Sequence, residues 1–219
     1  MITTSSSFVK DSFSKLSYIV TTPTGFDPAK ESLPLIVYLH GVGESGDNIE
    51  AVKTHGIPKY FCKDQDYLGL RVVTLSPQCP WDKIWNGITV QLMNLIEIVA
   101  NKLNIDKNRI TITGNSMGGF GTWEMACEYN NYFAAAAPIC GGGMSWRASA
   151  LAKMPVRAFH GSDDLVVPIE YSKLMVDTVN AAHGHAELTV FDNVGHDSWT
   201  SAYEKTDLIK WLASAEKQG

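Results

Sequence analysis

The sequence predicts an α/β fold in which a mostly parallel, doubly wound sheet is flanked by helices. Several near-continuous apolar runs, such as LPLIVYLH at residues 33–40, are typical of strands that are buried on both faces. Segments with helical periodicity separate these runs, as in right-handed βαβ units. With 219 residues, 45% of them hydrophobic and 19% charged, the chain has ample material for one core. We therefore expect a single domain over residues 1–219.

The expected strands begin with residues 16–22, an alternating segment that ends at Pro23, Thr24 and Gly25. Six apolar or β-branched runs predict the other strands, at residues 33–40, 70–76, 109–113, 133–140, 156–160 and 187–191. Residues 1–14 are rich in Ser and Thr, and we expect a loose or edge segment there.

Helices are expected between these strands. In residues 88–103, apolar side chains repeat at positions i, i+3 and i+4, which gives one face of an amphipathic helix. The other predicted helices are at residues 116–128, 170–182 and 203–213. The chain contains no internal repeat or linker, and only fourteen residues separate Cys140 from Pro155. We therefore expect no cap domain and an open site.

The composition of the chain excludes some classes of function. The 18 basic and 23 acidic side chains give a net charge of −5, which does not suit a dedicated nucleic-acid binder. No stretch approaches the roughly 18 consecutive apolar residues of a membrane span, and the first residues do not resemble a signal peptide. The four cysteines are widely spaced, so we expect free thiols. These features favour a cytoplasmic protein, although a domain cut from a longer secreted protein would share them, and they leave the oligomeric state open.

A glycine-rich turn from Gly114 through Ser116 to Gly118 directly follows the strand expected at residues 109–113. In this setting the pattern G-x-S-x-G lifts the serine side chain out of the sheet at a tight strand-to-helix turn. The helix that begins there offers free N–H groups to a developing oxyanion. A phosphate-binding turn is disfavoured, because the turn matches neither G-x-x-x-x-G-K-[ST] nor G-x-G-x-x-G. Ser116 is therefore the predicted nucleophile.

Two later loops supply the partners that a serine nucleophile needs, a base and an orienting carboxylate. Asp164 follows the strand expected at residues 156–160, and His196 follows the strand that ends at Phe191. Both loops lie at the carboxyl ends of strands, where open α/β sheets place their sites. The chain order of Ser116, Asp164 and His196 is the one that this topology requires.

Neighbouring polar residues offer alternatives to these assignments. Asp163 is the rival to Asp164, and the spacing to the following Val-Val-Pro favours Asp164. Asp197 is expected to have a structural role, because in most loop geometries its side chain points away from that of the adjacent His196. His40 and His160 lie at strand ends and are expected to make structural hydrogen bonds.

Ester chemistry also needs backbone donors for the oxyanion. One is expected from the N–H of Met117, the residue after the nucleophile. The second is expected from Val42, because Gly41 and Gly43 on either side allow the backbone to turn its N–H inward. A generic flexible loop is the alternative for this segment. Trp85 is a candidate wall of the substrate pocket, with ordinary packing as the alternative.

The chain resembles the α/β-hydrolase superfamily in the segments LPLIVYLHGVGESGDN, RITITGNSMGGFGTW, VRAFHGSDDLVVP and VGHDSWTSAY, which span almost the whole sequence. Within it, the chain is similar to small, lid-less carboxylesterases of the phospholipase/carboxylesterase and dienelactone-hydrolase groups. It is also similar to predicted peptidases and polysaccharide-associated esterases. The resemblance implies a nucleophile at Ser116, an acid at Asp164, a base at His196, and oxyanion donors at Val42 and Met117.

The predicted activity is hydrolysis of carboxylic esters through an acyl-enzyme, on short-chain acyl esters or on carbohydrate-linked acetyl or feruloyl esters. We expect no metal or cofactor, since His183 and His185 have no carboxylate or cysteine at ligand spacing. The expected partner is therefore a small-molecule or carbohydrate-linked ester, with no nucleic acid and no membrane. Two alternatives are a prolyl-oligopeptidase-like serine peptidase and a non-catalytic binding protein of the same fold.

Overall fold

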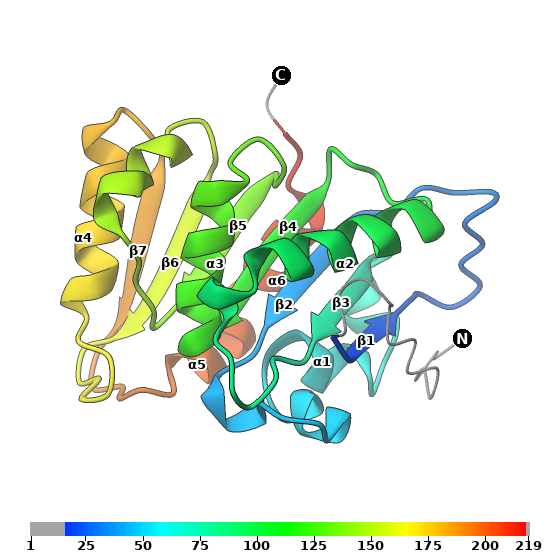
Figure 1. Cartoon of the computed structure of the whole chain (residues 1–219), viewed down its shortest axis with the longest axis horizontal. Helices are drawn as coiled ribbons and strands as arrows, with labels where there is room; N and C mark the ends of the chain where they lie inside the picture. Colours follow the sequence, from blue (N-terminus) through cyan, green and yellow to red (C-terminus); the bar gives the residue numbers. More distant parts are fainter. Residues whose placement is uncertain (1–15, 218–219) are drawn as a thin grey trace.

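A seven-stranded sheet forms the centre of the structure, a computed structural model that describes residues 16–217 (Figure 1). The strand order is β1-β3-β2-β4-β5-β6-β7, and each neighbouring pair is parallel except β1 and β3. The strands are β1 (Tyr18–Thr21), β2 (Leu35–Leu39), β3 (Val73–Pro77), β4 (Ile110–Asn115), β5 (Ala135–Ile139), β6 (Val156–Gly161) and β7 (Ala186–Phe191). All of them overlap the predicted strands. The expectation for residues 1–14 lies outside the described residues.

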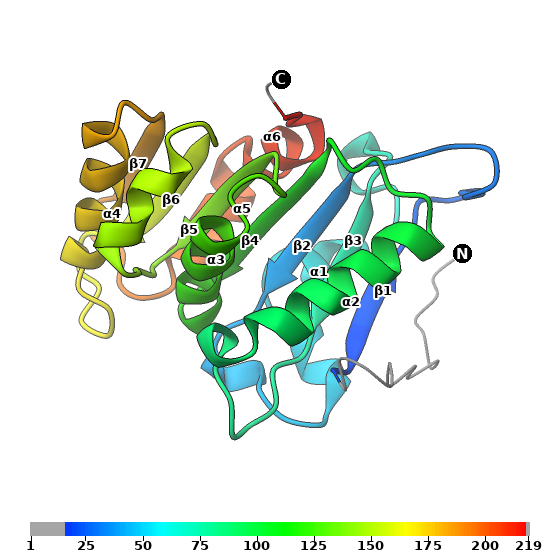
Figure 2. The same cartoon turned by 45° about the horizontal axis from the view of Figure 1, so that its top comes forward.

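Helices cover both faces of this sheet. They are α1 (Gly56–Phe61), α2 (Thr89–Lys102), α3 (Met117–Glu128), α4 (Glu170–Ala181), α5 (Ser198–Lys205) and α6 (Leu208–Ser214). In Figures 1 and 2, α2, α3 and α4 lie in front of the sheet and α1, α5 and α6 behind it. The buried side chains form two main clusters with the same division, one on each side of the sheet. The predicted α/β architecture is therefore confirmed, and it is that of the α/β-hydrolase fold.

Strand β2 illustrates why the sequence of a central strand is apolar throughout. Leu35, Val37 and Leu39 point into the cluster under α2 and α3, while Ile36 and Tyr38 point into the cluster under α1 and α6. All five residues are fully buried. Successive side chains of a strand face opposite sides, so a strand that is covered on both sides has no solvent-facing position.

One helical prediction needs correction, and one helix was not anticipated. The single helix expected over residues 203–213 is divided into α5 and α6 at Thr206, whose backbone is extended (φ −125°, ψ 176°). The Thr206 hydroxyl donates to the Ala202 carbonyl (2.6 Å) and accepts the N–H of Leu208 (3.1 Å), so one side chain ends the first helix and starts the second. Helix α1 was not predicted, because it has only six residues and contains glycine and proline.

The connection from β5 to β6 contains one short 3-10 helix, Ser145–Leu151, and no inserted domain. Within residues 16–217 the expected absence of a cap is therefore confirmed. All four cysteines are free thiols, as predicted. Among the described residues, no helix combines the length and the apolar character that crossing a bilayer would require.

Candidate active site

Ser116 lies at the sharp turn between β4 and α3. Its backbone is in a left-handed conformation (φ 56°, ψ −119°), which is strained for a residue with a side chain. The flanking glycines make the turn possible: a Cβ at Gly118 would lie 1.9 Å from the Leu39 carbonyl oxygen, and one at Gly114 would lie 2.5 Å from that oxygen. The Ser116 N–H is held by the Ile139 carbonyl at 3.0 Å. The G-x-S-x-G spacing thus follows from close backbone packing.

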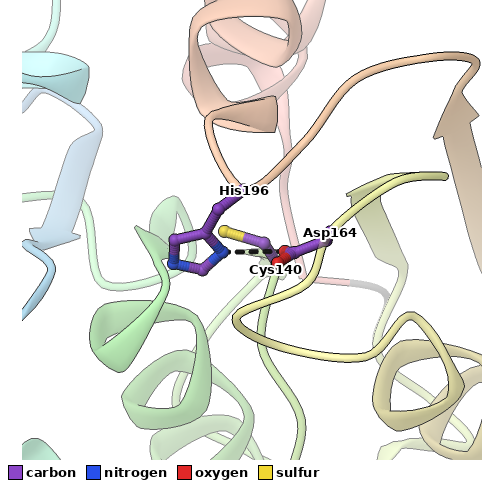
Figure 3. A group of neighbouring side chains, drawn as sticks. All are labelled: Cys140, Asp164 and His196. Carbon is purple, nitrogen blue, oxygen red and sulfur yellow. Dashed lines mark hydrogen bonds and ion pairs between the residues drawn. The ribbon is translucent and has the colours of Figure 1, made fainter.

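Three side chains that are far apart in the sequence form one hydrogen-bonded chain. The Ser116 hydroxyl lies 2.8 Å from Nε2 of His196, and Nδ1 of His196 lies 2.7 Å from Oδ2 of Asp164. Because the carboxylate can only accept there, the proton of the neutral imidazole lies on Nδ1 and Nε2 is free to accept the serine proton. Figure 3 shows the imidazole of His196 turned toward Asp164 across two neighbouring loops. The structure therefore brings together the three predicted residues.

The Asp164 carboxyl group is inaccessible to solvent but well supplied with donors. The backbone N–H groups of Val166 and Val167 both donate to Oδ1 at 2.9 Å, and His196 donates to Oδ2. Burial alone would raise the pKa of Asp164, but these hydrogen bonds outweigh it and lower the pKa below its usual value. Asp164 is therefore a carboxylate at neutral pH and can orient an imidazole.

The neighbouring aspartates have other partners. Asp163 accepts the Ser162 hydroxyl at 2.6 Å. Asp197 caps α5, because its side chain accepts the N–H of Thr200 at 3.1 Å and the Thr200 hydroxyl at 3.0 Å. The structure thus pairs His196 with Asp164 and not with its rival, and it gives Asp197 the structural role expected from the sequence.

The two candidate oxyanion donors lie beside the nucleophile. Val42 begins the 3-10 helix Val42–Glu44, and Met117 begins α3. The first N–H groups of a helix have no acceptor within it, so neither of these N–H groups is used by its own helix. A Cβ built on Gly41 would lie 3.6 Å from the Cβ of Ser116, which shows how closely this loop approaches the serine.

An open groove of about 550 Å³ leads to the serine. It is lined by Val42, Ile84, Asn86, Ser116, Met117 and Phe120. The prediction that Trp85 walls the pocket is wrong: its side chain is fully buried, and its indole N–H donates to the His40 carbonyl at 3.0 Å. Its neighbours Ile84 and Asn86 take that place. The predicted loop does line the groove. Within it, the large ring of Trp85 packs into the core, whereas the smaller side chain of Ile84 is exposed.

Cys140 is a neighbour of the site that sequence analysis did not anticipate. Its thiol lies at the end of β5, accepts the Ser116 N–H at 3.3 Å and, in Figure 3, lies beside Asp164. Burial raises the pKa of Cys140 to about 12, so it is a neutral thiol. Cys140, Asp164 and His196 each offer one potential ligand atom, and these three atoms lie within 4.8 Å of one another, a spacing that metal ligands can have. His196 and Asp164 already share a hydrogen bond, so the group suits proton transfer better than ligation.

The two other strand-end histidines are buried and hydrogen-bonded, as predicted. His40 accepts the Cys79 N–H on Nε2 at 2.9 Å, and its Nδ1 contacts the Gly41 carbonyl. Burial lowers the pKa of His40 to about 4, which keeps the ring neutral. His160 contacts Ser172 through Nδ1.

The sheet order, the strained serine turn and the chain order of the three polar residues define an α/β-hydrolase. The chain belongs to the dienelactone hydrolase family, whose family model matches residues 79–216. This confirms the resemblance that the sequence motifs indicate.

Several relatives carry names that describe esterases. A bifunctional acetylxylan esterase/xylanase of Neocallimastix patriciarum is 25% identical over 134 residues, which are 61% of this chain and 20% of the relative. The "Probable feruloyl esterase C" of Aspergillus terreus is 27% identical over 156 residues, 70% of this chain and 56% of the relative. The chain thus spans only part of the length of these curated relatives.

Solved structures show the same fold. A thermostable esterase superposes with a TM-score of 0.84 at 30% identity, covering 92% of this chain and 60% of that protein. The feruloyl esterase module of Clostridium thermocellum, an S954A mutant complexed with sinapinate, superposes with a TM-score of 0.72 at 16% identity, covering 93% of this chain and 86% of that one.

Proposed function

We propose that this protein is a serine carboxylesterase that uses Ser116, His196 and Asp164 as a catalytic triad. The observation that carries the proposal is the continuous hydrogen-bonded chain from the Ser116 hydroxyl through His196 to Asp164, with distances of 2.8 and 2.7 Å. Ester hydrolysis needs a nucleophile, a base and a group that orients the base, and these three residues can fill those roles. Membership of a hydrolase family and the esterase names of the relatives support the same activity.

The reaction follows from the proton positions. Ser116 Oγ attacks the ester carbonyl carbon while its proton moves to Nε2 of His196, and Asp164 stabilises the imidazolium through Nδ1. The N–H groups of Val42 and Met117 stabilise the negative oxygen of the tetrahedral intermediate. The C–O bond to the alcohol then breaks, and His196 returns the proton to the departing alkoxide. Water attacks the acyl-enzyme with His196 again as base, which releases the acid and restores the Ser116 hydroxyl. No cofactor takes part in these steps.

The groove favours esters with an apolar acyl or aryl group on a larger alcohol. Val42, Ile84 and Phe120 provide its apolar walls, and Asn86 is an amide next to them that could bond a phenolic or methoxy oxygen. The groove is open, so a sugar or other bulky alcohol could remain in solvent while the acyl end lies against Ser116. Carbohydrate-linked feruloyl or acetyl esters fit this shape, as the names of the relatives suggest.

The test is a panel of p-nitrophenyl esters of increasing acyl length together with acetylated and feruloylated sugars, assayed on the wild type and on Ser116→Ala. We expect the variant to fold normally and to lose almost all turnover on each substrate that the wild type hydrolyses. Retention of turnover by Ser116→Ala would reject the assignment.

Two further measurements separate the alternative functions. Faster cleavage of an amide than of the matching ester would favour a peptidase. Labelling with a serine-reactive phosphonate is expected to reach one equivalent per chain and to require Ser116, whereas a non-catalytic binding protein would not label stoichiometrically.

A further inference from the structure

A second histidine, besides His196, lies against Asp164, and it is buried. His160 belongs to the end of β6, and its side chain and that of Asp164 are both fully inaccessible to solvent. Nε2 of His160 lies 3.3 Å from Oδ2 of Asp164 and 2.9 Å from the carbonyl oxygen of Val167. One oxygen of the carboxylate therefore has two imidazoles as neighbours, and one of these takes no part in the reaction described above.

The partners of His160 determine where its proton lies. Nε2 faces two oxygens that can only accept, the Val167 carbonyl and the ionised Asp164, so Nε2 must carry a proton. Nδ1 lies 2.8 Å from the Ser172 hydroxyl, which can also donate to the Gly141 carbonyl at 2.9 Å. The Ser172 hydroxyl has a single proton. If it donates this proton to Nδ1, Nδ1 is an acceptor; if it donates to the Gly141 carbonyl, Nδ1 is a donor. In both cases Nε2 remains a donor.

We propose that His160 is a positioning residue for the catalytic carboxylate. The proposal rests on the proposed esterase function, and it adds a residue that never touches the substrate. The N–H on Nε2 of His160 donates to the carbonyl oxygen of Val167, and the N–H of the same Val167 donates to Oδ1 of Asp164. His160 therefore stabilises the turn from Asp164 to Val167. It also places a positive dipole 3.3 Å from Oδ2, the oxygen that accepts the proton on Nδ1 of His196.

The arrangement fixes the carboxylate from several directions. Oδ1 receives the N–H groups of Val166 and Val167, and Oδ2 contacts a ring nitrogen of each histidine. Ser172, on α4, ties His160 in turn to Gly141 beyond the end of β5. With these donors in place, a rotation of the Asp164 side chain would break contacts on both oxygens. The geometry that His196 needs is therefore built into the core below the site.

A matched pair of substitutions tests the proposal. Glutamine and methionine have similar length and volume, but only glutamine has an N–H donor near the position of Nε2. We expect His160→Met to lower kcat by roughly 10- to 100-fold, by analogy with the loss seen when the partners that orient metal-binding side chains are removed. KM is expected to stay within about twofold, because the groove is untouched. His160→Gln is expected to recover most of the lost kcat.

A double-mutant cycle separates a positioning role from a general loss of structure. In an Asp164→Ala background, adding His160→Met is expected to change the residual kcat by less than about twofold, because the group through which it acts is gone. Equal losses in both backgrounds, or equal kcat for His160→Met and His160→Gln, would overturn the proposal.

A spectroscopic measurement on the wild type covers the case in which the methionine variant fails to fold. Long-range ¹H–¹⁵N correlation of the histidine rings is expected to show a proton on Nε2 of His160 at neutral pH. A ring protonated only on Nδ1 would refute the proposal. Ser116→Ala is assayed in parallel: if turnover does not need Ser116, the esterase mechanism fails, whereas the ring protonation still reports on His160 alone.

Discussion

Trp199 lies edge-on to His196, with ring centroids 5.4 Å apart and ring planes at 89°. Trp199 also contacts the ring of His55, at 5.5 Å between centroids. The indole N–H of Trp199 is buried without a hydrogen-bond partner among the described residues, so the ring acts through packing. We expect this packing to limit the rotation of the imidazole that lies between Ser116 and Asp164.

Replacing Trp199 with alanine is expected to lower kcat by roughly two- to tenfold, because an edge-to-face ring pair contributes about 0.5–1.5 kcal/mol to holding one ring orientation. Trp199→Phe keeps an aromatic ring against the imidazole and is expected to stay within about twofold of the wild type. Steady-state kinetics on p-nitrophenyl acetate provides the measurement. Identical rates for the alanine and phenylalanine variants would show that the contact does not hold His196.

The oxyanion role of Val42 can be tested without disturbing the loop. Proline removes the N–H, and the backbone suits it, because Gly41 before it is extended (φ −74°, ψ 179°) and Val42 begins a helix. We expect Val42→Pro to lower kcat by roughly 10²–10³-fold, the usual effect of losing one oxyanion donor. Val42→Ala keeps the N–H and removes only a side chain that is 70% exposed. Similar losses in the two variants would assign the effect to the side chain.

The apolar groove predicts a dependence on acyl size. Ile84 is 56% exposed and lines the groove next to Phe120, so its side chain can contact an acyl chain but has little to reach in an acetyl group. We expect Ile84→Ala to lower kcat/KM for hexanoyl and feruloyl esters by roughly fivefold, equivalent to about 1 kcal/mol of lost apolar contact, with little change for acetyl esters. Val90→Ala, on α2 and similarly exposed at 59%, is the matched control. An equal change for all acyl groups would argue against this binding mode.

The positions of Ser116, Asp164 and His196 could be predicted because each follows a strand, and parallel strands bring their carboxyl ends to one edge of the sheet. The turn at Ser116 could be predicted from its own residues, because the backbone packing leaves no room for a side chain at Gly114 or Gly118. The positions of the three polar residues and the form of the serine turn depend only on strand order and on residues nearby in the sequence. The sequence predicts both.

Contacts across the fold could not be predicted in the same way. Whether Trp85 points into the groove or into the core depends on the space left by Gly121, where a Cβ would lie 2.5 Å from the Trp85 side chain. The contact of His160 with Asp164 likewise depends on the course of the loop that returns to Val167. The division of the last helix depends on a single hydroxyl at Thr206. None of these has a periodic signal in the sequence.

His40 predicts a dependence of stability on pH that is separate from catalysis. Burial lowers its pKa in the folded protein to about 4, while the unfolded chain has the ordinary value of 6.5. Between these values the unfolded state binds the extra proton, so this group makes the free energy of unfolding fall as the pH drops from 6.5 to 4. The loss approaches about 3.5 kcal/mol below both values, from about 1.4 kcal/mol per pKa unit. Well above pH 6.5 the contribution is complete and constant.

Urea unfolding of the wild type and of His40→Gln at several pH values between 4 and 8 tests this prediction. The glutamine is uncharged at every pH, so the variant is expected to lose stability less steeply between pH 6.5 and 4, whatever its stability at neutral pH. Glu44 lies 3.8 Å from Nδ1 of His40, and burial raises its pKa, which gives a contribution of the opposite sign. The comparison is therefore repeated with Glu44→Gln.

His185→Gln, at an exposed position, is the matched control and is expected to keep the wild-type slope. Parallel curves for the wild type and His40→Gln would mean that folding does not lower the pKa of His40.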